Sequence, residues 1–174
     1  MTAITTLLTP RLILRPISLD DAQAYHPLVN DPQILEYTTE QPLSSLAEVR
    51  ELLRTRPLAD YQRYGYGRLA CIERHTGRLI GFSGLKFLDD LQQVDVGYRF
   101  LPDCWGKGYA TESSRAVIEH GFQELGLSRI IGLVMPQNTP SARVLQKVGL
   151  HYEKRIRVDD CNEELDLYAT SRAE

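Results

Sequence analysis

The sequence predicts a mixed α/β (α+β) fold, rather than a doubly wound sheet, in a single domain spanning residues 1–174. Hydrophobic spacing gives the order strand, two helices, three strands, helix, strand, helix and two strands, so strands and helices do not alternate regularly. The 174 residues are 43% hydrophobic and 25% charged, which suits one domain with a real core.

Capping and breaking residues set the bounds of these elements. Ser18 with Asp21, and Ser45 with Glu48, each match a capping box, in which side chains satisfy free N–H groups at a helix start. Pro57 should end or kink the second helix, because proline lacks a backbone donor and clashes with the preceding turn. The predicted strands are 11–15, 68–73, 78–85, 93–101, 129–135, 151–158 and 164–171, and the predicted helices are about 18–29, 45–57, 108–126 and 139–149.

Turn residues indicate how the later elements are joined. The segments 75–78 and 159–162 are typical of tight turns, so each should connect two antiparallel strands. Gly126 is well placed for the C-terminal cap of the third helix. Thr139 followed by Pro140 predicts an N-cap with proline at the first helical position of the fourth helix.

Composition and charge argue against several classes of protein. The net charge of −3 disfavours nucleic-acid binding, and no apolar run approaches the roughly 18 residues of a membrane span. The start of the chain lacks the basic and apolar regions of a signal peptide. Cys71, Cys104 and Cys161 form neither a zinc pattern nor a disulfide framework. We therefore expect a cytoplasmic monomer or homodimer that binds no metal, nucleic acid or membrane.

The most informative segment is the glycine-rich run 105–112, Trp-Gly-Lys-Gly-Tyr-Ala-Thr-Glu, which follows a predicted strand and opens a helix. Free N–H groups and the helix dipole make such a start an anion site, and glycine lets a ligand approach the backbone. Only one residue separates Gly106 from Gly108, which does not fit a Walker A loop. Thr111 stands where a dinucleotide-binding motif needs its third glycine. Both nucleotide interpretations are weakened.

This run resembles motif A of the GNAT acetyltransferases, Arg/Gln-x-x-Gly-x-Gly/Ala, with Trp105, Gly108 and Ala110 at the fixed positions. Trp105 departs from the usual Arg or Gln, and the departure resembles the Rim-type branch, the N-acetyltransferases of ribosomal proteins and their relatives. The resemblance implies that backbone N–H groups bind the pyrophosphate of acetyl-CoA. The alternative is an ordinary helix-capping turn, with Lys107 a solvated lysine. The implied binding residues are Gly106, Lys107, Gly108, Tyr109, Ala110 and Thr111.

The resemblance, which extends loosely over residues 10–172, also implies the shape of the sheet. The family sheet is mixed but mostly antiparallel, with about seven strands flanked by about four helices, and it is splayed between its fourth and fifth strands. Here those strands would be 93–101 and 129–135, with pantetheine in the gap. Backbone groups near Phe100 and Leu101 would pair with pantetheine as a strand would, while the side chains of this segment belong to the core.

A second segment, 138–150, resembles motif B of the same family, Asn-x-x-Ala/Ser-x-x-x-Tyr-x-Lys-x-Gly-Phe. The resemblance implies that Asn138 contacts the pantetheine arm, and the alternative is a plain turn asparagine. Many members carry a tyrosine at the position of Leu145, where it protonates the departing thiolate. Leucine has no proton to donate, so Ser141 is the best candidate for this role. Its alternative role is to cap the helix start.

Acetyl transfer to an amine also requires a base, because the amine must be neutral to attack. Asp95 lies on the strand beside the expected gap, where many relatives carry an acid. Strand alternation places Asp95, Gly97 and Arg99 on one face. We consider Asp95 as the base, against the alternative of an ordinary solvated or salt-bridged acid.

The function predicted from these residues is acetyl-CoA-dependent N-acetylation of a primary amine, by direct attack on the thioester in a ternary complex. The acceptor would be a small-molecule amine or a protein N-terminal α-amine. The resemblance implies that residues 30–63 line the acceptor entrance, where acidic and tyrosine side chains could attract a cationic amine: Glu36, Tyr37, Glu40, Asp60 and Tyr61. The alternative is an ordinary solvated helix face. The alternative is a non-catalytic module that binds coenzyme A as a sensor.

Overall fold

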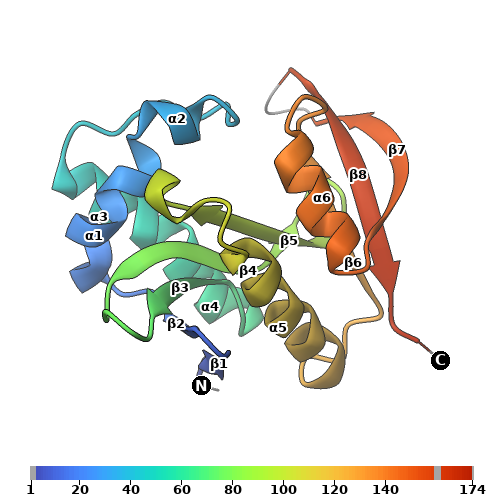
Figure 1. Ribbon diagram of the computed structural model, residues 1–174, viewed down its shortest axis with the longest axis horizontal. Helices are drawn as coiled ribbons and strands as arrows, with labels where there is room; N and C mark the ends of the chain where they lie inside the picture. The colour runs from blue at the N-terminus through green and yellow to red at the C-terminus, as the bar shows by residue number, and fades with distance from the viewer. Residues whose placement is uncertain (1–2, 159–161, 174) are drawn as a thin grey trace.

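A computed structural model describes residues 3–158 and 162–173 (Figure 1). Its eight-stranded sheet has the order β1-β2-β3-β4-β5-β6-β8-β7. Only β5 and β6 pair in parallel among the paired strands. The mixed fold predicted from the sequence is therefore confirmed. The strands are β1 Leu7–Leu8, β2 Leu12–Pro16, β3 Arg68–Glu73, β4 Leu79–Leu88, β5 Gln93–Phe100, β6 Arg129–Val134, β7 His151–Arg157 and β8 Glu164–Ser171.

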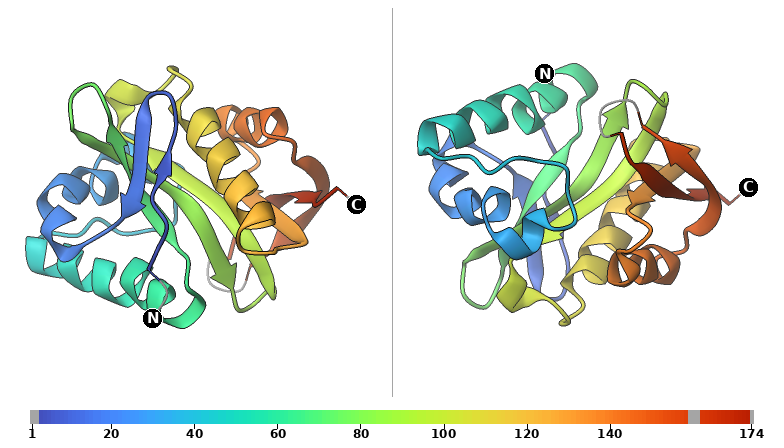
Figure 2. Two further views of the ribbon diagram at one scale, coloured as in Figure 1. Left: turned by 90° about the horizontal axis from the view of Figure 1, so that it is seen from below. Right: turned by 90° about the horizontal axis from the view of Figure 1, so that it is seen from above.

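Helices cover both faces of this sheet. Figures 1 and 2 show α1, α3 and α4 on one face and α5 on the other, with α6 beside α5 and against β6. The α-helices are α1 Ala22–Tyr25, α2 Pro32–Leu35, α3 Leu46–Thr55, α4 Pro57–Tyr64, α5 Tyr109–Gln123 and α6 Thr139–Lys147. Short 3₁₀ turns occupy Leu19–Asp21, His26–Val29 and Pro102–Cys104.

Several predicted bounds differ from the structure for local reasons. The first predicted helix is broken into 3₁₀, α and 3₁₀ segments, and Pro27, which lacks a backbone donor, lies at the start of the last of them. Pro57 ends α3 as expected, but it also starts α4, because proline is tolerated at the first helical position. The two-residue β1 and the one-turn α2 are too short to show a hydrophobic period. Of the predicted turn 159–162, residues 159–161 lie outside the described part of the chain.

The feature that shapes the site is the separation of β5 from β6. Their parallel pairing has a single register position, Asp95 opposite Ile131. Beyond it β5 continues along its antiparallel neighbour β4, with Phe100 opposite Gly81, whereas β6 continues along β8. The C-terminal halves of the two strands therefore diverge, as predicted for this strand pair, and leave room between them.

Leu145 of α6, which is 2% exposed, packs against β6 beside this opening. Its methyl groups lie against the backbone of Gly132 on β6, where an added Cβ would come within 2.8 Å of them. Gly132 thus lets the helix approach the strand closely. The packing of Leu145 on this glycine fixes the distance between α6 and β6.

Leu145→Ala should destabilise the fold by about 2–5 kcal/mol, because the methyl groups removed are fully buried and the rigid strand cannot collapse into the cavity. Urea denaturation followed by circular dichroism measures the loss. Val144→Ala, at a half-buried position on the same helix, is the control and should cost clearly less. Equal losses would contradict the role given to Leu145.

Candidate active site

The glycine-rich loop presents the free N–H groups of α5 toward the opening. Gly106 and Gly108 have φ angles of 75° and 85°, in the left-handed region that favours glycine, and Gly108 is the N-cap residue of the helix. The helix begins at Tyr109, one residue after the predicted start. Its first backbone N–H groups have no partner in the preceding turn of the helix, so they form an anion site.

Two charged residues fasten this loop to the first strands. The Arg11 guanidinium donates to the Lys107 carbonyl at 2.8 Å and to the Glu112 carboxylate at 2.8 Å, and the Thr9 hydroxyl also donates to Glu112 at 2.6 Å. Burial raises the pKa of Glu112, but the hydrogen bonds from Thr9 and Arg11 outweigh it and leave the pKa below its ordinary value. Glu112 therefore stays ionised and holds the loop. Sequence reasoning missed Arg11, whose partners are about a hundred residues away.

Two aromatic side chains hold the other edge of the loop. The Tyr109 ring stacks on Phe100, and its hydroxyl donates to Glu73 at 2.5 Å, so the side chain is an anchor and only the backbone faces the opening. The Trp105 indole N–H donates to the Phe100 carbonyl at 2.8 Å. Trp105 therefore ties the loop to the end of β5 at the position where the family usually has Arg or Gln.

A cavity of about 770 Å³ fills the space between the diverging strands. The loop lines it with Gly106, Gly108 and Ala110, and α6 adds the side chains of Arg143 and Lys147. These two cations lie one helical turn apart on one face of α6. Sequence reasoning missed the pair, although its spacing of four residues is visible in the sequence. The cavity can hold an elongated ligand with an anionic end at the loop.

Not every predicted binding residue has a free group at this cavity. The Lys107 side chain is exposed and does not line it. The N–H of Leu101 donates to the Ile80 carbonyl at 2.9 Å, and its carbonyl accepts from Cys104 at 2.9 Å. Because successive N–H groups of a strand point to opposite sides, Phe100 rather than Leu101 directs its N–H toward β6.

Asn138 and Ser141 lie together at the start of α6. The Asn138 side chain is the N-cap and accepts from the Ser141 N–H at 3.3 Å, so the predicted N-cap at Thr139 is wrong by one residue. The Tyr98 hydroxyl donates to the Ser141 carbonyl at 2.9 Å and lies 2.8 Å from the Ser141 hydroxyl. Burial raises the pKa of Tyr98 to about 12, so it keeps its proton at neutral pH.

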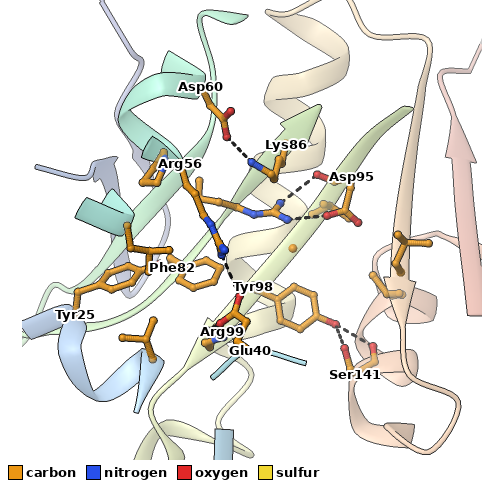
Figure 3. A pocket seen from close by; sticks show the side chains of 18 residues that line it. Tyr25, Glu40, Arg56, Asp60, Phe82, Lys86, Asp95, Tyr98, Arg99 and Ser141 are labelled. Carbon is orange, nitrogen blue, oxygen red and sulfur yellow. Dashed lines mark hydrogen bonds and ion pairs between the residues drawn. The ribbon is translucent and has the colours of Figure 1, made fainter. Parts of the chain in front are cut away.

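A second cavity, of about 330 Å³, lies between the α3–α4 helices and strands β4 and β5 (Figure 3). It shares with the first cavity the residues Glu40, Tyr98, Arg99, Leu133 and Ser141. The two cavities therefore adjoin along these five residues, and the Tyr98–Ser141 hydrogen bond is part of their common wall.

Ion pairs cross the second cavity. Arg68 of β3 pairs with Asp95 at 2.7 Å, and Lys86 of β4 pairs with Asp60 at 2.8 Å (Figure 3). Burial raises the pKa of Asp95 and outweighs the Arg68 guanidinium, which lowers it. Asp95 is thus a buried, salt-bridged acid at the vertex where β5 and β6 separate. The predicted common face is also present, because a Cβ added at Gly97 would overlap the Arg68 guanidinium.

Two of the acids predicted to attract a cationic amine, Glu40 and Asp60, have cationic partners. Glu40 and Asp60 line the second cavity, but each accepts from a cationic side chain in it. The Tyr61 hydroxyl donates to the Arg68 carbonyl and accepts from the Ile17 N–H at 3.0 Å, so it anchors α4 to the sheet. The negative charges of Glu40 and Asp60 are therefore compensated by cationic side chains that lie far from them in the sequence.

Within the ranges 3–158 and 162–173, no cluster of His, Cys, Asp or Glu side chains could hold a metal ion. No helix in those ranges is long and apolar enough to cross a membrane.

Comparisons with known proteins agree with this geometry. Residues 11–151 match the family model described as an acetyltransferase (GNAT) domain. The chain is similar to the uncharacterized N-acetyltransferase p20 of Bacillus licheniformis, with 31% identity over 154 residues that cover 87% of this chain and 85% of the relative. An acetyltransferase structure from Agrobacterium tumefaciens str. C58 has a TM-score of 0.83 and 26% identity, covering 99% of this chain and 97% of that one. A spermidine N-acetyltransferase from Vibrio cholerae, solved with CoA and spermine, shares the fold with a TM-score of 0.75 and 20% identity, over 92% and 95% of the two chains.

Glu112→Gln should lower stability at neutral pH, and the loss should vanish in acid. The folded pKa lies below the unfolded one, so the carboxylate stabilises the fold above its unfolded pKa, near 4.3, and this contribution is lost as pH falls through the folded value. We expect a loss of about 1–3 kcal/mol in urea denaturation at pH 7. Glu119→Gln, at an exposed glutamate of the same helix, is the control. A difference that persists undiminished at low pH would contradict this assignment.

Proposed function

The chain belongs to the GNAT acetyltransferase family, and we propose that it transfers the acetyl group of acetyl-CoA to a primary amine in a ternary complex. One observation carries the proposal: the two cavities meet at Tyr98 and Ser141. Such a junction lets an amine in the smaller cavity reach a thioester in the larger one without a covalent enzyme intermediate. Burial raises the pKa of the Cys71 thiol, which disfavours a thiolate nucleophile there.

The residues of the larger cavity fit coenzyme A. The start of α5 offers backbone N–H groups for the diphosphate, and Arg143 and Lys147 offer cations for the remaining phosphate. The gap between β5 and β6 suits the pantetheine arm, with a backbone N–H from Phe100. Bound acetyl-CoA would supply a thioester for attack by the neutral amine. The spermidine N-acetyltransferase of the same fold that was solved with CoA and spermine supports coenzyme A as the ligand.

We propose that Ser141 assists the departure of the thiolate, in place of the tyrosine that Leu145 replaces. The Tyr98 hydroxyl has one hydrogen and two acceptors at Ser141. When the Tyr98 hydroxyl donates to the Ser141 carbonyl, the Ser141 hydroxyl can donate to the Tyr98 oxygen. When the Tyr98 hydroxyl instead donates to the Ser141 hydroxyl oxygen, the Ser141 hydroxyl hydrogen is free to point into the gap. Tyr98, whose role sequence reasoning limited to the core, would thus orient the Ser141 hydroxyl toward the departing thiolate.

We keep Asp95 as the proposed base that takes the proton of the amine, directly or through water. Its carboxylate lines the smaller cavity and is buried. Because burial raises its pKa, its proton affinity moves toward that of an amine. The Arg68 guanidinium holds the carboxylate at the vertex of the gap.

Within the family we propose the Rim-type branch and a cytoplasmic location. The branch rests on Trp105 in motif A and on serine and leucine at positions 141 and 145 of motif B. The location rests on Cys71 and Cys104, which are free thiols in the structure.

Gly108→Val should weaken coenzyme A binding by roughly tenfold or more, about 1.4 kcal/mol, in calorimetric titration. A side chain at φ 85° strains the loop, and its Cβ would lie 3.4 Å from the Arg11 guanidinium that holds the loop. Gly77→Val is a matched control, because Gly77 also has a positive φ, of 72°, with open space around it, but it lies in the β3–β4 turn. Equal affinity in the two folded variants would remove the loop from the binding site.

Ser141→Ala should lower kcat by about tenfold or more, with little change in the KM for acetyl-CoA. Tyr98→Phe should act on the same step, so the double variant should lose little more than the worse single variant. Thiol release from acetyl-CoA with a panel of amines provides the measurement. An unaltered rate in Ser141→Ala would exclude Ser141 from the mechanism. Tight coenzyme A binding without turnover on any amine would instead favour the sensor function.

A further inference from the structure

The smaller cavity has an unequal number of opposite charges. Of the described residues that line it, four are cationic and three carry carboxylates, so the balance is one positive charge. The cations are Arg56, Arg68, Lys86 and Arg99, and the acids are Glu40, Asp60 and Asp95. Two of the acids have one cation each, in the Arg68–Asp95 and Lys86–Asp60 pairs. The excess positive charge therefore lies at Glu40, whose two cationic neighbours are Arg56 and Arg99.

Glu40 is shared by two guanidinium groups. Arg99 is 15% exposed and donates to Glu40 at 2.9 Å, and it also donates to the Leu28 carbonyl at 3.2 Å. Arg56 reaches the other Glu40 oxygen at 3.3 Å and is 55% exposed, so it is the more weakly held of the two (Figure 3). One carboxylate cannot neutralise both groups. Arg56 is thus free to bind a second anion with little loss.

The walls and size of the cavity limit what that anion is attached to. A volume of about 330 Å³ is at the small end of ligand pockets, which suits a small molecule. Stacked Tyr25 and Phe82 rings form one apolar wall, and the Arg99 guanidinium lies over Phe82. Arginine binds carboxylate and phosphate groups through two parallel hydrogen bonds. The cavity thus offers a small ligand an apolar surface and an anion site side by side.

We propose that the acceptor is a small amine that also carries an acidic group, a carboxylate or a phosphate, held by Arg56 beside Arg99. This inference rests on the proposed function, since it names the acceptor of that reaction. The acidic group would neutralise the excess positive charge of the cavity. The same excess charge repels a polyamine and favours the neutral, nucleophilic form of the acceptor amine. A protein N-terminus fits less well, because its first carboxyl group is tied up in a peptide bond.

Matched acceptor pairs test the acidic group directly. One pair is an apolar α-amino acid and its amide, the second is an amino-sugar phosphate and the unphosphorylated sugar, and spermidine is the cationic reference. We expect kcat/KM to favour the acidic member of at least one pair by roughly tenfold or more, and spermidine to be the poorest acceptor. A preference within the amino-acid pair would identify the acidic group as a carboxylate, and a preference within the sugar pair would identify it as a phosphate. Equal rates within both pairs, or a preference for spermidine, would overturn the proposal.

Substitutions at Arg56 test the site. Arg56→Gln should raise the KM for the acidic acceptor by about tenfold while the KM for acetyl-CoA is unchanged. Arg56→Glu should go further and shift the preference toward spermidine, because it reverses the charge balance. Arg54→Gln is the control: Arg54 lies two residues earlier, is 65% exposed and pairs with Glu51 outside the cavity. If Arg56→Gln behaves like Arg54→Gln, the anion site is not at Arg56.

A binding measurement separates this proposal from the proposed function. Ligand-detected NMR with coenzyme A present compares the amino acid with its amide, and the sugar phosphate with its sugar, without any turnover. If no amine is acetylated but the acidic ligands bind preferentially to the wild-type protein and not to Arg56→Gln, the reaction fails and the anion site stands. If acetylation occurs without such a preference, the anion site fails and the reaction stands.

Discussion

The candidate site depends on one strand pair that separates after a single register position. β5 is held along its length by β4, and β6 by β8, so neither strand can turn back toward the other. The gap is therefore built into the sheet and needs no loop movement to open. Leu145 packed on Gly132 holds α6 beside it. Both cavities, the loop at α5 and the Tyr98–Ser141 contact take their positions from this divergence.

Buried charge is concentrated where the strands part. Asp95, Arg68 and Gly97 form one unit, because glycine at 97 leaves space for the guanidinium that neutralises the carboxylate. A larger residue there would force Arg68 away and leave a buried acid without its cation, which is strongly destabilising. The same unit borders the smaller cavity, so the stability of the vertex and the charge presented to a ligand are set by the same side chains.

Local signals explain what the sequence could predict. The glycine loop, the start of α5 and the divergence of the two strands follow from short motifs, and the structure contains all three. The ion pairs escaped prediction because they join residues far apart in sequence, such as Arg99 with Glu40 and Arg11 with Glu112. The sequence therefore predicted that Glu40 and Asp60 attract a cationic ligand, whereas the structure pairs each of them with a cationic side chain. The catalytic roles of Ser141 and Asp95 stay predictions.

Trp105 gives the molecule an optical property as well as an anchor. It is the one tryptophan among the 174 residues, 44% exposed, and its indole lines the larger cavity while bonded to Phe100. Light at the red edge of the protein absorption band excites tryptophan and not tyrosine. The fluorescence that it produces therefore comes from the Trp105 indole alone. Its emission reports on the solvent at the mouth of the gap, and a ligand entering there would change it without any label.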